Sequence, residues 1–204
     1  MDLPTALQLA RSTLIQEADS LRELAEGLDD RLWEVARRIA GCPGLVWVTG
    51  VGTSAAIGER FAHILTDCGV RSIFLSPDIG LHGHSGAMAA GEILVALSRG
   101  GESDEVNRMV EIANRRGLIT VALVHDLDST LARACAHVLP VRSPEAFELG
   151  GYVATTSTVV ACGMCDALAA LVLKLTGYTV DQFRHTHPGG AVGQSLGAPN
   201  RPPA

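Results

Sequence analysis

Residues 45–55 read Leu45-Val-Trp-Val-Thr-Gly50-Val-Gly-Thr-Ser-Ala55, an apolar run that ends in a glycine turn. A helical pattern follows over residues 56–67. Unpaired backbone N–H groups and the positive end of the helix dipole converge at such a junction, so the junction favours an anion. The stretch therefore predicts a strand, a turn and a helix in succession, with a phosphorylated ligand at the turn.

Short apolar runs alternate with helical patterns from residue 44 onward, and the helical stretches lie near residues 55–68, 103–116 and 128–136. Short β-rich runs separated by helices are typical of a parallel sheet with helices on both faces. We therefore expect an α/β fold, a three-layer αβα sandwich of the flavodoxin-like or Rossmann-like kind with a five-stranded parallel sheet. The expected strands are 45–48, 72–75, 93–97, 119–124 and 138–141.

Leucines recur every seven residues in the N-terminal segment 5–41, which Gly27 and the pair Asp29-Asp30 divide into two helices. This apolar stripe is longer than one sheet face can cover, so we expect it to pack partly on another subunit. The alternative is an ordinary amphipathic helix that folds on its own domain. The stripe consists of Leu7, Leu14, Leu21 and Leu28.

Composition excludes several classes of protein. The formal net charge is -6 and the basic residues are scattered, which argues against nucleic acid as a partner. Residues 159–175 are apolar but interrupted by Asp166 and Lys174, which indicates a buried helix and no membrane partner. Five irregularly spaced cysteines and an N-terminus without signal-peptide features predict a cytoplasmic protein with reduced thiols.

The 204 residues are a length usual for one domain, with a helical segment at 5–41, an α/β core at 44–176 and a C-terminal segment at 178–196. Two more hydroxyl-rich helix starts lie in the core. Ser98-Arg-Gly-Gly-Glu-Ser103 follows the third strand, and Thr155-Thr-Ser-Thr158 opens the long apolar helix. Ligands of parallel sheets bind at the carboxyl edge, so all three starts can surround one phosphate. For any one start alone, simple helix capping is the alternative.

These stretches, in this order, resemble the sugar isomerase (SIS) domain proteins, and among them the arabinose-5-phosphate isomerase type. The resemblance covers residues 5–196 and extends to Leu81-His-Gly83, Glu145-Ala146 and His187-Pro-Gly-Gly190-Ala-Val-Gly193. It implies a five-stranded parallel sheet flanked by helices and a homodimer or homotetramer. It also implies that the sugar phosphate binds between subunits, in active sites that the subunits share.

The resemblance implies roles for individual residues. Glu102 is similar to the family's active-site glutamate, and Glu145 to a second acidic group. His187 matches the histidine that reaches the reacting end of the sugar, and His82 a histidine near the substrate. The phosphate cradle would consist of Gly52, Thr53, Ser54, Ser98, Ser103, Thr156, Ser157 and Thr158.

The sequence departs from the arabinose-5-phosphate enzymes at three points. Thr53 stands where those enzymes carry a lysine, and Arg99 is a candidate for the cation that is then missing. Gly100 replaces the second serine of the serine turn. We also expect a form without the paired regulatory CBS modules. The type of reaction is therefore predicted more sharply than the sugar.

Aldose–ketose isomerisation moves a proton between C1 and C2 of the sugar through a cis-enediol. A carboxylate screened from water can have its pKa raised towards neutrality, where histidine already titrates. We assign the carbon base and the oxygen shuttle to Glu102 and His187, in either order, with Glu145 assisting and neither metal nor redox cofactor required. The alternative for Glu102 is a structural role, because a carboxylate is favourable at a helix N-terminus. The alternative for His187 is a polar C-cap residue.

Other interpretations fit parts of the sequence. Gly50-x-Gly52-x-x-Ala55 approximates a dinucleotide fingerprint, but Asp78 lies too far along to hold a ribose. A metal site is another alternative, because three pairs of metal-binding residues are closely spaced: His82-Gly-His84, His185-Thr-His187 and Cys162-x-x-Cys165. The cysteines fall inside an apolar helix pattern, which favours a packing role for them. The main alternatives are a non-catalytic sugar-phosphate sensor and an isomerase of another sugar phosphate, such as a hexulose 6-phosphate.

Overall fold

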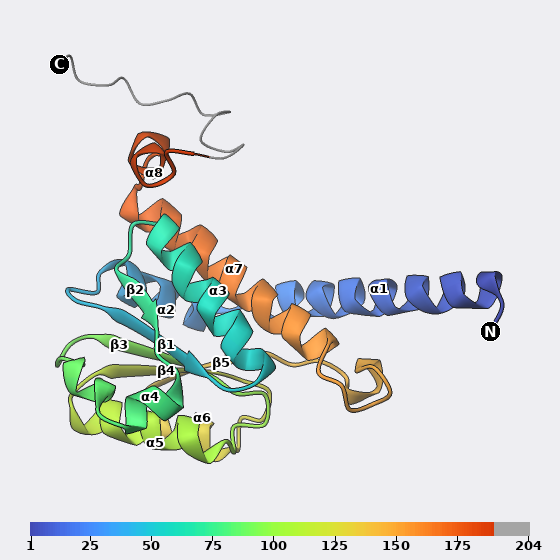
Figure 1. Ribbon diagram of the computed structural model, residues 1–204, viewed down its shortest axis with the longest axis horizontal. Helices are drawn as coiled ribbons and strands as arrows, with labels where there is room; N and C mark the ends of the chain where they lie inside the picture. The colour runs from blue at the N-terminus through green and yellow to red at the C-terminus, as the bar shows by residue number, and fades with distance from the viewer. Residues whose placement is uncertain (190–204) are drawn as a thin grey trace.

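A five-stranded parallel sheet forms the centre of the computed structural model, which describes residues 1–189 (Figure 1). Its strand order is β2-β1-β3-β4-β5, and every neighbouring pair is parallel. The third and fourth strands have the expected bounds, and the other three differ by one or two residues. The strands are β1 (Val46–Gly50), β2 (Ser72–Phe74), β3 (Ile93–Leu97), β4 (Ile119–Val124) and β5 (His137–Pro140).

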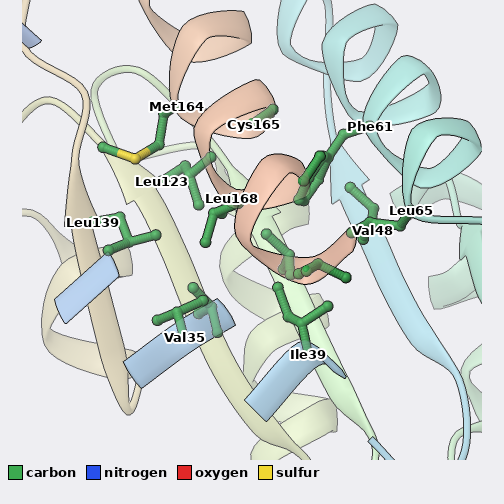
Figure 2. Packing of buried hydrophobic residues seen from close by; sticks show 14 of the residues in the cluster. Val35, Ile39, Val48, Phe61, Leu65, Leu123, Leu139, Met164, Cys165 and Leu168 are labelled. Carbon is green, nitrogen blue, oxygen red and sulfur yellow. The ribbon is translucent and has the colours of Figure 1, made fainter. Parts of the chain in front are cut away.

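One face of the sheet is covered by α2 (Asp30–Ala40), α3 (Thr53–Asp67) and α7 (Thr156–Thr176). In α2 the buried residues Leu32, Val35, Ala36 and Ile39 recur at helical spacing, so a single apolar stripe meets the sheet. Figure 2 shows how side chains from these helices and from the strands interdigitate in this layer, among them Phe61, Leu168 and Leu139. Close packing of this kind fixes the positions of α3 and α7 on the sheet.

The other face is covered by α4 (Pro77–Leu81), α5 (Asp104–Arg115) and α6 (Thr130–Ala134) (Figure 1). The apolar stripe of α5, which includes Val106 and Met109, packs on β-strand residues such as Leu94. Every residue of β1 and β3 is buried because both faces are covered. The expected three-layer α/β sandwich is therefore confirmed.

Helix α7 is the one helix within residues 1–189 that is long and apolar enough to cross a membrane. Its residues Val160, Met164, Leu168 and Val172 are nevertheless buried at four-residue intervals, and the helix packs on α1, α2 and α3. A helix in the core of a protein needs this composition. The expectation of a buried helix is therefore confirmed for this face of α7.

Helix α1 (Leu3–Glu26) projects away from the rest of the molecule (Figure 1). Its C-terminal part packs on α7, where Gly163 leaves room for Leu21 and Leu24. Its first turns carry exposed apolar side chains, including Leu3 and Leu14, which are 70% and 65% exposed. The chain therefore leaves the N-terminal part of the stripe uncovered, and its packing on another subunit stays a prediction.

A buried glutamate, Glu92, ties the amino edge of the sheet together. Its carboxylate accepts hydrogen bonds from the backbone amides of Leu45 and Ala89 and from the Trp47 indole, at 2.9, 2.9 and 2.7 Å. Burial alone raises the pKa of Glu92, but these hydrogen bonds together lower it below its usual value. The carboxylate is therefore a charged structural anchor at the edge opposite the predicted ligand site.

Candidate active site

The three predicted helix starts meet beyond the carboxyl ends of β1 and β3. Gly52, with φ of +57°, turns the chain from β1 into α3, where Thr53 and Ser54 lie on the first turn. These two residues line one small cavity together with residues from the serine turn and from α7. The cavity is about 30 Å³ and is lined in part by Ser98, Arg99, Ser157 and Thr158. It has room for a water molecule but not for a phosphate group.

Several hydroxyls around this cavity are already used by the backbone. Ser98 Oγ accepts a hydrogen bond from the Gly101 amide at 3.2 Å and lies 3.2 Å from Ser103 Oγ. Thr156 Oγ1 donates to the Phe147 carbonyl, and Thr158 Oγ1 donates to a carbonyl within its own helix start. These hydroxyls are therefore engaged within the chain, although no N-cap residue of α3, α5 or α7 makes a side-chain capping hydrogen bond in the described residues. Ser157 Oγ differs, because it is buried and has no hydrogen-bond partner among the described residues.

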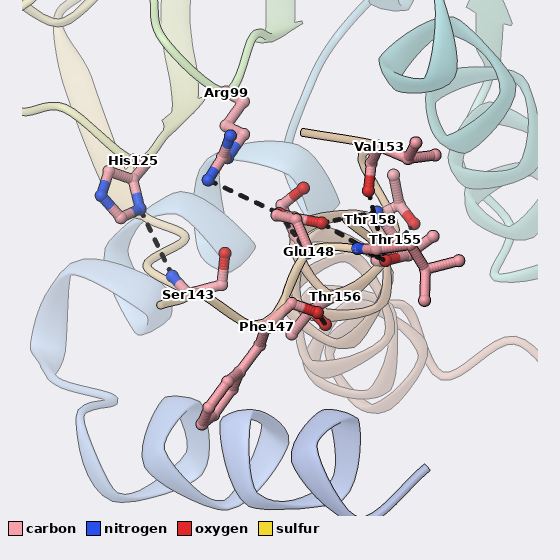
Figure 3. A network of polar contacts seen from close by, with 11 residues as sticks. Arg99, His125, Ser143, Phe147, Glu148, Val153, Thr155, Thr156 and Thr158 are labelled. Carbon is pink, nitrogen blue, oxygen red and sulfur yellow. Dashed lines mark hydrogen bonds and ion pairs between the residues drawn. The ribbon is translucent and has the colours of Figure 1, made fainter. Parts of the chain in front are cut away.

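The N-terminus of α7 is occupied by a carboxylate of the same chain, that of Glu148 (Figure 3). The side chain is fully buried, and it accepts hydrogen bonds from the amides of Thr155 at 2.6 Å and Ser157 at 3.1 Å. Arg99 Nη2 lies 3.5 Å from the same carboxylate. The chain therefore contains a complete anion site of two helix amides and a guanidinium, filled by its own glutamate.

The environment of Glu148 keeps it ionised. Burial by itself raises the pKa of this carboxyl, but the adjacent Ser157 side chain, the amides of Thr155 and Ser157, and the charge of Arg99 together lower it below its usual value. The sequence patterns did not single out Glu148. The available signal is the Gly150-Gly151 pair, since both glycines have positive φ and turn the chain so that the glutamate reaches the helix start.

Arg99 is the cation nearest to this anion site. Its guanidinium borders the small cavity on one side and a wide, open cavity on the other. Its Nε is buried without a hydrogen-bond partner among residues 1–189. The residue suggested as a replacement for the missing lysine thus lies beside the small cavity, which Thr53 also lines.

The open cavity has a volume of about 640 Å³ and carries most of the titratable groups at this edge. Glu145, predicted as the second acidic group, lines it from a short 3-10 helix, η2 (Glu145–Phe147). His125, which follows β4 directly, lines it as well, and its Nδ1 accepts a hydrogen bond from the Ser143 amide at 3.3 Å. The sequence patterns did not indicate His125. A polar residue just after a buried strand, at the carboxyl edge, was the available signal.

Glu102 borders neither cavity. Its two carboxylate oxygens accept hydrogen bonds from the amide and hydroxyl of Thr130, both at 2.8 Å, at the start of α6. These contacts lower the pKa of Glu102 below its usual value, whereas a carbon base needs it raised. Within this chain Glu102 is thus an exposed carboxylate bound to the start of α6, and its role as a carbon base stays a prediction.

The two predicted histidines also lie apart from the cavities within one chain. His82 is exposed at the C-cap of α4 and lines neither cavity. His187 follows α8 (Val180–Thr186), and its Nε2 lies 3.7 Å from Asp67 at the end of α3. Because α3 has 15 residues and begins at the small cavity, its length separates His187 from that cavity by about 20 Å. Residues 190–193 of the same motif lie outside the described residues.

Comparison with known protein families identifies the domain to which these elements belong. A family model described as the SIS domain matches residues 42–171, well over half of the chain. The chain belongs to the SIS domain family. The matched region contains the glycine turn, the serine turn, the Glu148 turn and the start of α7, whereas α1 and α8 lie outside it. Both cavities at the carboxyl edge are therefore built mainly by the SIS domain.

Several relatives share nearly the whole chain. Arabinose 5-phosphate isomerase KdsD of Escherichia coli K12 is 31% identical over 190 residues, which are 93% of this chain but 58% of KdsD. The chain thus spans less than two thirds of the curated relatives it matches. A proposed sugar-phosphate isomerase of Listeria monocytogenes superposes with a TM-score of 0.88 at 26% identity, covering 93% of this chain and all of that one.

A second solved structure shares the fold. A protein of Escherichia coli CFT073, solved in complex with a sugar phosphate, superposes with a TM-score of 0.87 at 21% identity, covering 92% of this chain and all of that one. These structures and the family match confirm the SIS fold predicted from the sequence.

We predict that Glu148→Gln lowers the free energy of unfolding by about 1–2 kcal/mol at pH 7, because the amides at the start of α7 lose the negatively charged carboxylate that accepts their hydrogen bonds. A carboxyl with a lowered pKa stabilises the fold above its unfolded pKa, and this contribution disappears as pH falls through the folded pKa. The difference in stability between parent and variant should therefore begin to narrow near the usual pKa of glutamate, about 4.3, and close as the pH falls through the lowered folded pKa. Urea unfolding followed by tryptophan fluorescence at several pH values measures it.

Glu145→Gln is the matched control, because Glu145 is an exposed glutamate three residues away. It should change stability by less than about 0.5 kcal/mol at any of these pH values. Equal stability of the parent and Glu148→Gln at pH 7 would contradict the role given to the buried carboxylate.

Proposed function

We propose that this SIS chain is an aldose–ketose isomerase of sugar phosphates, acting on a pentose phosphate of the arabinose 5-phosphate and ribulose 5-phosphate type. The observation that carries the proposal is the anion site at α7, where two backbone amides and Arg99 hold the Glu148 carboxylate. The site lies where three hydroxyl-rich helix starts meet, as a phosphate monoester requires. The name of the KdsD relative supports the type of sugar.

The substrate phosphate would take the place of the Glu148 carboxylate. The small cavity cannot hold both anions, and two negative charges so close together would repel each other. Glu148 sits ahead of a turn with two glycines at positive φ, and this turn gives the segment a means of moving aside. The unpaired Ser157 hydroxyl, together with Ser54 at the opposite wall, then supplies donors to the phosphate oxygens.

The sugar would extend from this site into the open cavity. A base removes the proton from C2 of the aldose, the electron pair of the C–H bond forms the C1–C2 double bond, and O1 gains a proton. Return of a proton to C1 and loss of the proton on O2 gives the ketose. Within one chain, Glu145 and His125 line this cavity together with Asp126 and Asp128, and we assign such transfers to Glu145 and His125. Glu102 takes part only if its contacts with Thr130 break.

His187 would act in the cavity of another copy of the chain. It lies at the far end of α3 from its own cavity, so a direct role there requires a second subunit. The exposed leucines on the first turns of α1 support an oligomer, because such a stripe packs on a partner. We propose a homodimer or homotetramer with shared active sites. A cytoplasmic location remains part of the proposal and is supported by the five free cysteines.

The purified protein should exchange the C1 or C2 proton of arabinose 5-phosphate or ribulose 5-phosphate with solvent deuterium, as followed by NMR. The panel should include pentose and hexose phosphates, with a hexulose 6-phosphate among them. Exchange with a hexulose phosphate alone would keep the reaction and correct the sugar. Binding of a sugar phosphate without exchange of any proton would instead establish a sensor, for which Thr53 in place of lysine is the supporting observation.

Arg99→Gln should raise the KM for the sugar phosphate by about 10- to 100-fold, because a charge-assisted hydrogen bond to phosphate contributes about 1.5–3 kcal/mol. Arg99→Lys should recover part of the loss, since it restores the charge without the planar donor pair. Arg108→Gln, an exposed arginine on α5, is the control and should leave KM unchanged. An unchanged KM in Arg99→Gln would show that Arg99 does not bind the phosphate.

Mixing two inactive variants should restore activity if His187 serves the cavity of another copy. A heterodimer of Glu145→Gln and His187→Gln chains contains one site in which both residues are intact. Random exchange of subunits should then give about a quarter of the parent activity, since half of the dimers are mixed. Steady-state assays before and after subunit exchange measure the recovery. Full activity of His187→Gln alone would show that His187 has no role in turnover.

A further inference from the structure

We propose that His63, Asp67 and His187 form a binding site for a first-row divalent cation of the Zn²⁺ type. His63 and Asp67 lie one turn apart on α3, and His187 follows α8. One ligand atom from each residue lies within 4.8 Å of the other two. This cluster lies at the end of α3 opposite the cavities of its own chain, and its geometry does not depend on the proposed sugar-phosphate site. His187 has only one Nε2, so an ion bound here would exclude the role proposed for His187 in the cavity of another copy.

The distances suit a tetrahedral ion. Bonds of about 2.0–2.1 Å to a tetrahedral Zn²⁺ place neighbouring ligand atoms about 3.4 Å apart. His63 Nε2 lies 3.3 Å from Asp67 Oδ2, and His187 Nε2 lies 3.7 Å from Asp67 Oδ1. These two contacts use different oxygens of Asp67, and the ligand atoms of His63 and His187 lie within 4.8 Å of each other. His63 is 72% exposed at its side chain, so its ring is free to move toward His187. Little rearrangement is therefore needed to admit the ion.

The donor set selects the kind of cation. Two imidazole nitrogens and one carboxylate suit Zn²⁺ and its first-row neighbours, whereas Mg²⁺ and Ca²⁺ prefer oxygen ligands throughout. Three protein ligands leave a fourth tetrahedral position for water. The cluster is partly exposed, because Asp67 and His187 are 26% and 27% exposed at their side chains, so an ion can enter from solvent.

The imidazole of His187 is oriented before any ion arrives. Its Nδ1 lies 3.1 Å from the Phe183 carbonyl oxygen and 3.0 Å from Thr186 Oγ1, which itself donates to that carbonyl. The carbonyl can only accept a hydrogen bond, so it favours the tautomer with the proton on Nδ1. Nε2 is then unprotonated and points toward Asp67, as a metal ligand requires. The Phe183 ring stacks on the imidazole with centroids 3.7 Å apart and planes 11° apart, which fixes the plane of the ring.

The cluster differs from the closely spaced pairs of possible metal ligands in the sequence. His185, two residues before His187, has its Nδ1 2.6 Å from the Asp181 carbonyl and is not part of the cluster. Cys162 and Cys165 lie on α7, and burial raises the pKa of both thiols, so they stay protonated. The fold thus pairs His187 with two residues more than a hundred positions earlier in the chain.

The test titrates the full chain with Co²⁺ at pH 7.5, followed by visible absorption, and with Zn²⁺, followed by calorimetry. One ion should bind per chain, with the intense visible bands of tetrahedral cobalt. His63→Gln and Asp67→Asn should each weaken binding by at least about tenfold, because each removes one of three ligands. His185→Gln is the matched control on α8 and should bind as the parent does.

Zn²⁺ should also raise the Tm of the parent and of His185→Gln, but not of His63→Gln or Asp67→Asn, because the ion connects α8 to α3 in the folded state only. Absence of saturable binding would overturn the proposal and leave the contacts as ordinary His–Asp ion pairs. Equal affinity of the parent and both variants, or a near-ultraviolet thiolate-to-cobalt band, would do the same. No readout uses turnover, so the outcome is independent of the isomerase proposal.

Discussion

All five strands of the sheet run in one direction, and this constraint decides where the polar chemistry of the chain gathers. The carboxyl end of every strand, and the turn that follows it, lies at the same edge. The helices that start there direct their unpaired N–H groups toward one volume. At the opposite edge the helices end, so acceptor groups gather there, together with the side chains that close α3 and α8.

A converging set of donors needs an anion, and the chain supplies one in Glu148. The amino edge has a comparable arrangement, in which Glu92 accepts hydrogen bonds from two amides and an indole. The difference is that Glu92 stabilises a closed corner of the core, whereas Glu148 sits between a cation and a cavity. The same local chemistry therefore closes a corner of the core at one edge and lies beside a cavity at the other.

The fold was predictable because buried parallel strands have continuous apolar sequences, and each of these sequences ends at a recognisable turn. β1 was predicted too short, since it continues through Thr49, whose buried hydroxyl donates to the Leu75 carbonyl. The meeting of three hydroxyl-rich turns also followed from parallel strands. The contact of Glu148 with α7 did not, because it depends on the φ angles of two glycines in a turn. Nor did the position of His187, which depends on the 21-residue length of α7 carrying the chain to the far edge.

A tethered carboxylate in an anion site behaves as an intramolecular competitor. Any anion that enters must expel Glu148 first, so its apparent affinity equals its intrinsic affinity multiplied by the fraction of molecules in which the site is open. A singly charged ion offers the amides and Arg99 no more than the glutamate already does. A phosphate ester offers two charges and the contacts of its sugar. Under the proposed function, the buried glutamate would thus exclude weak anions and give way only to a ligand that binds more strongly than it does.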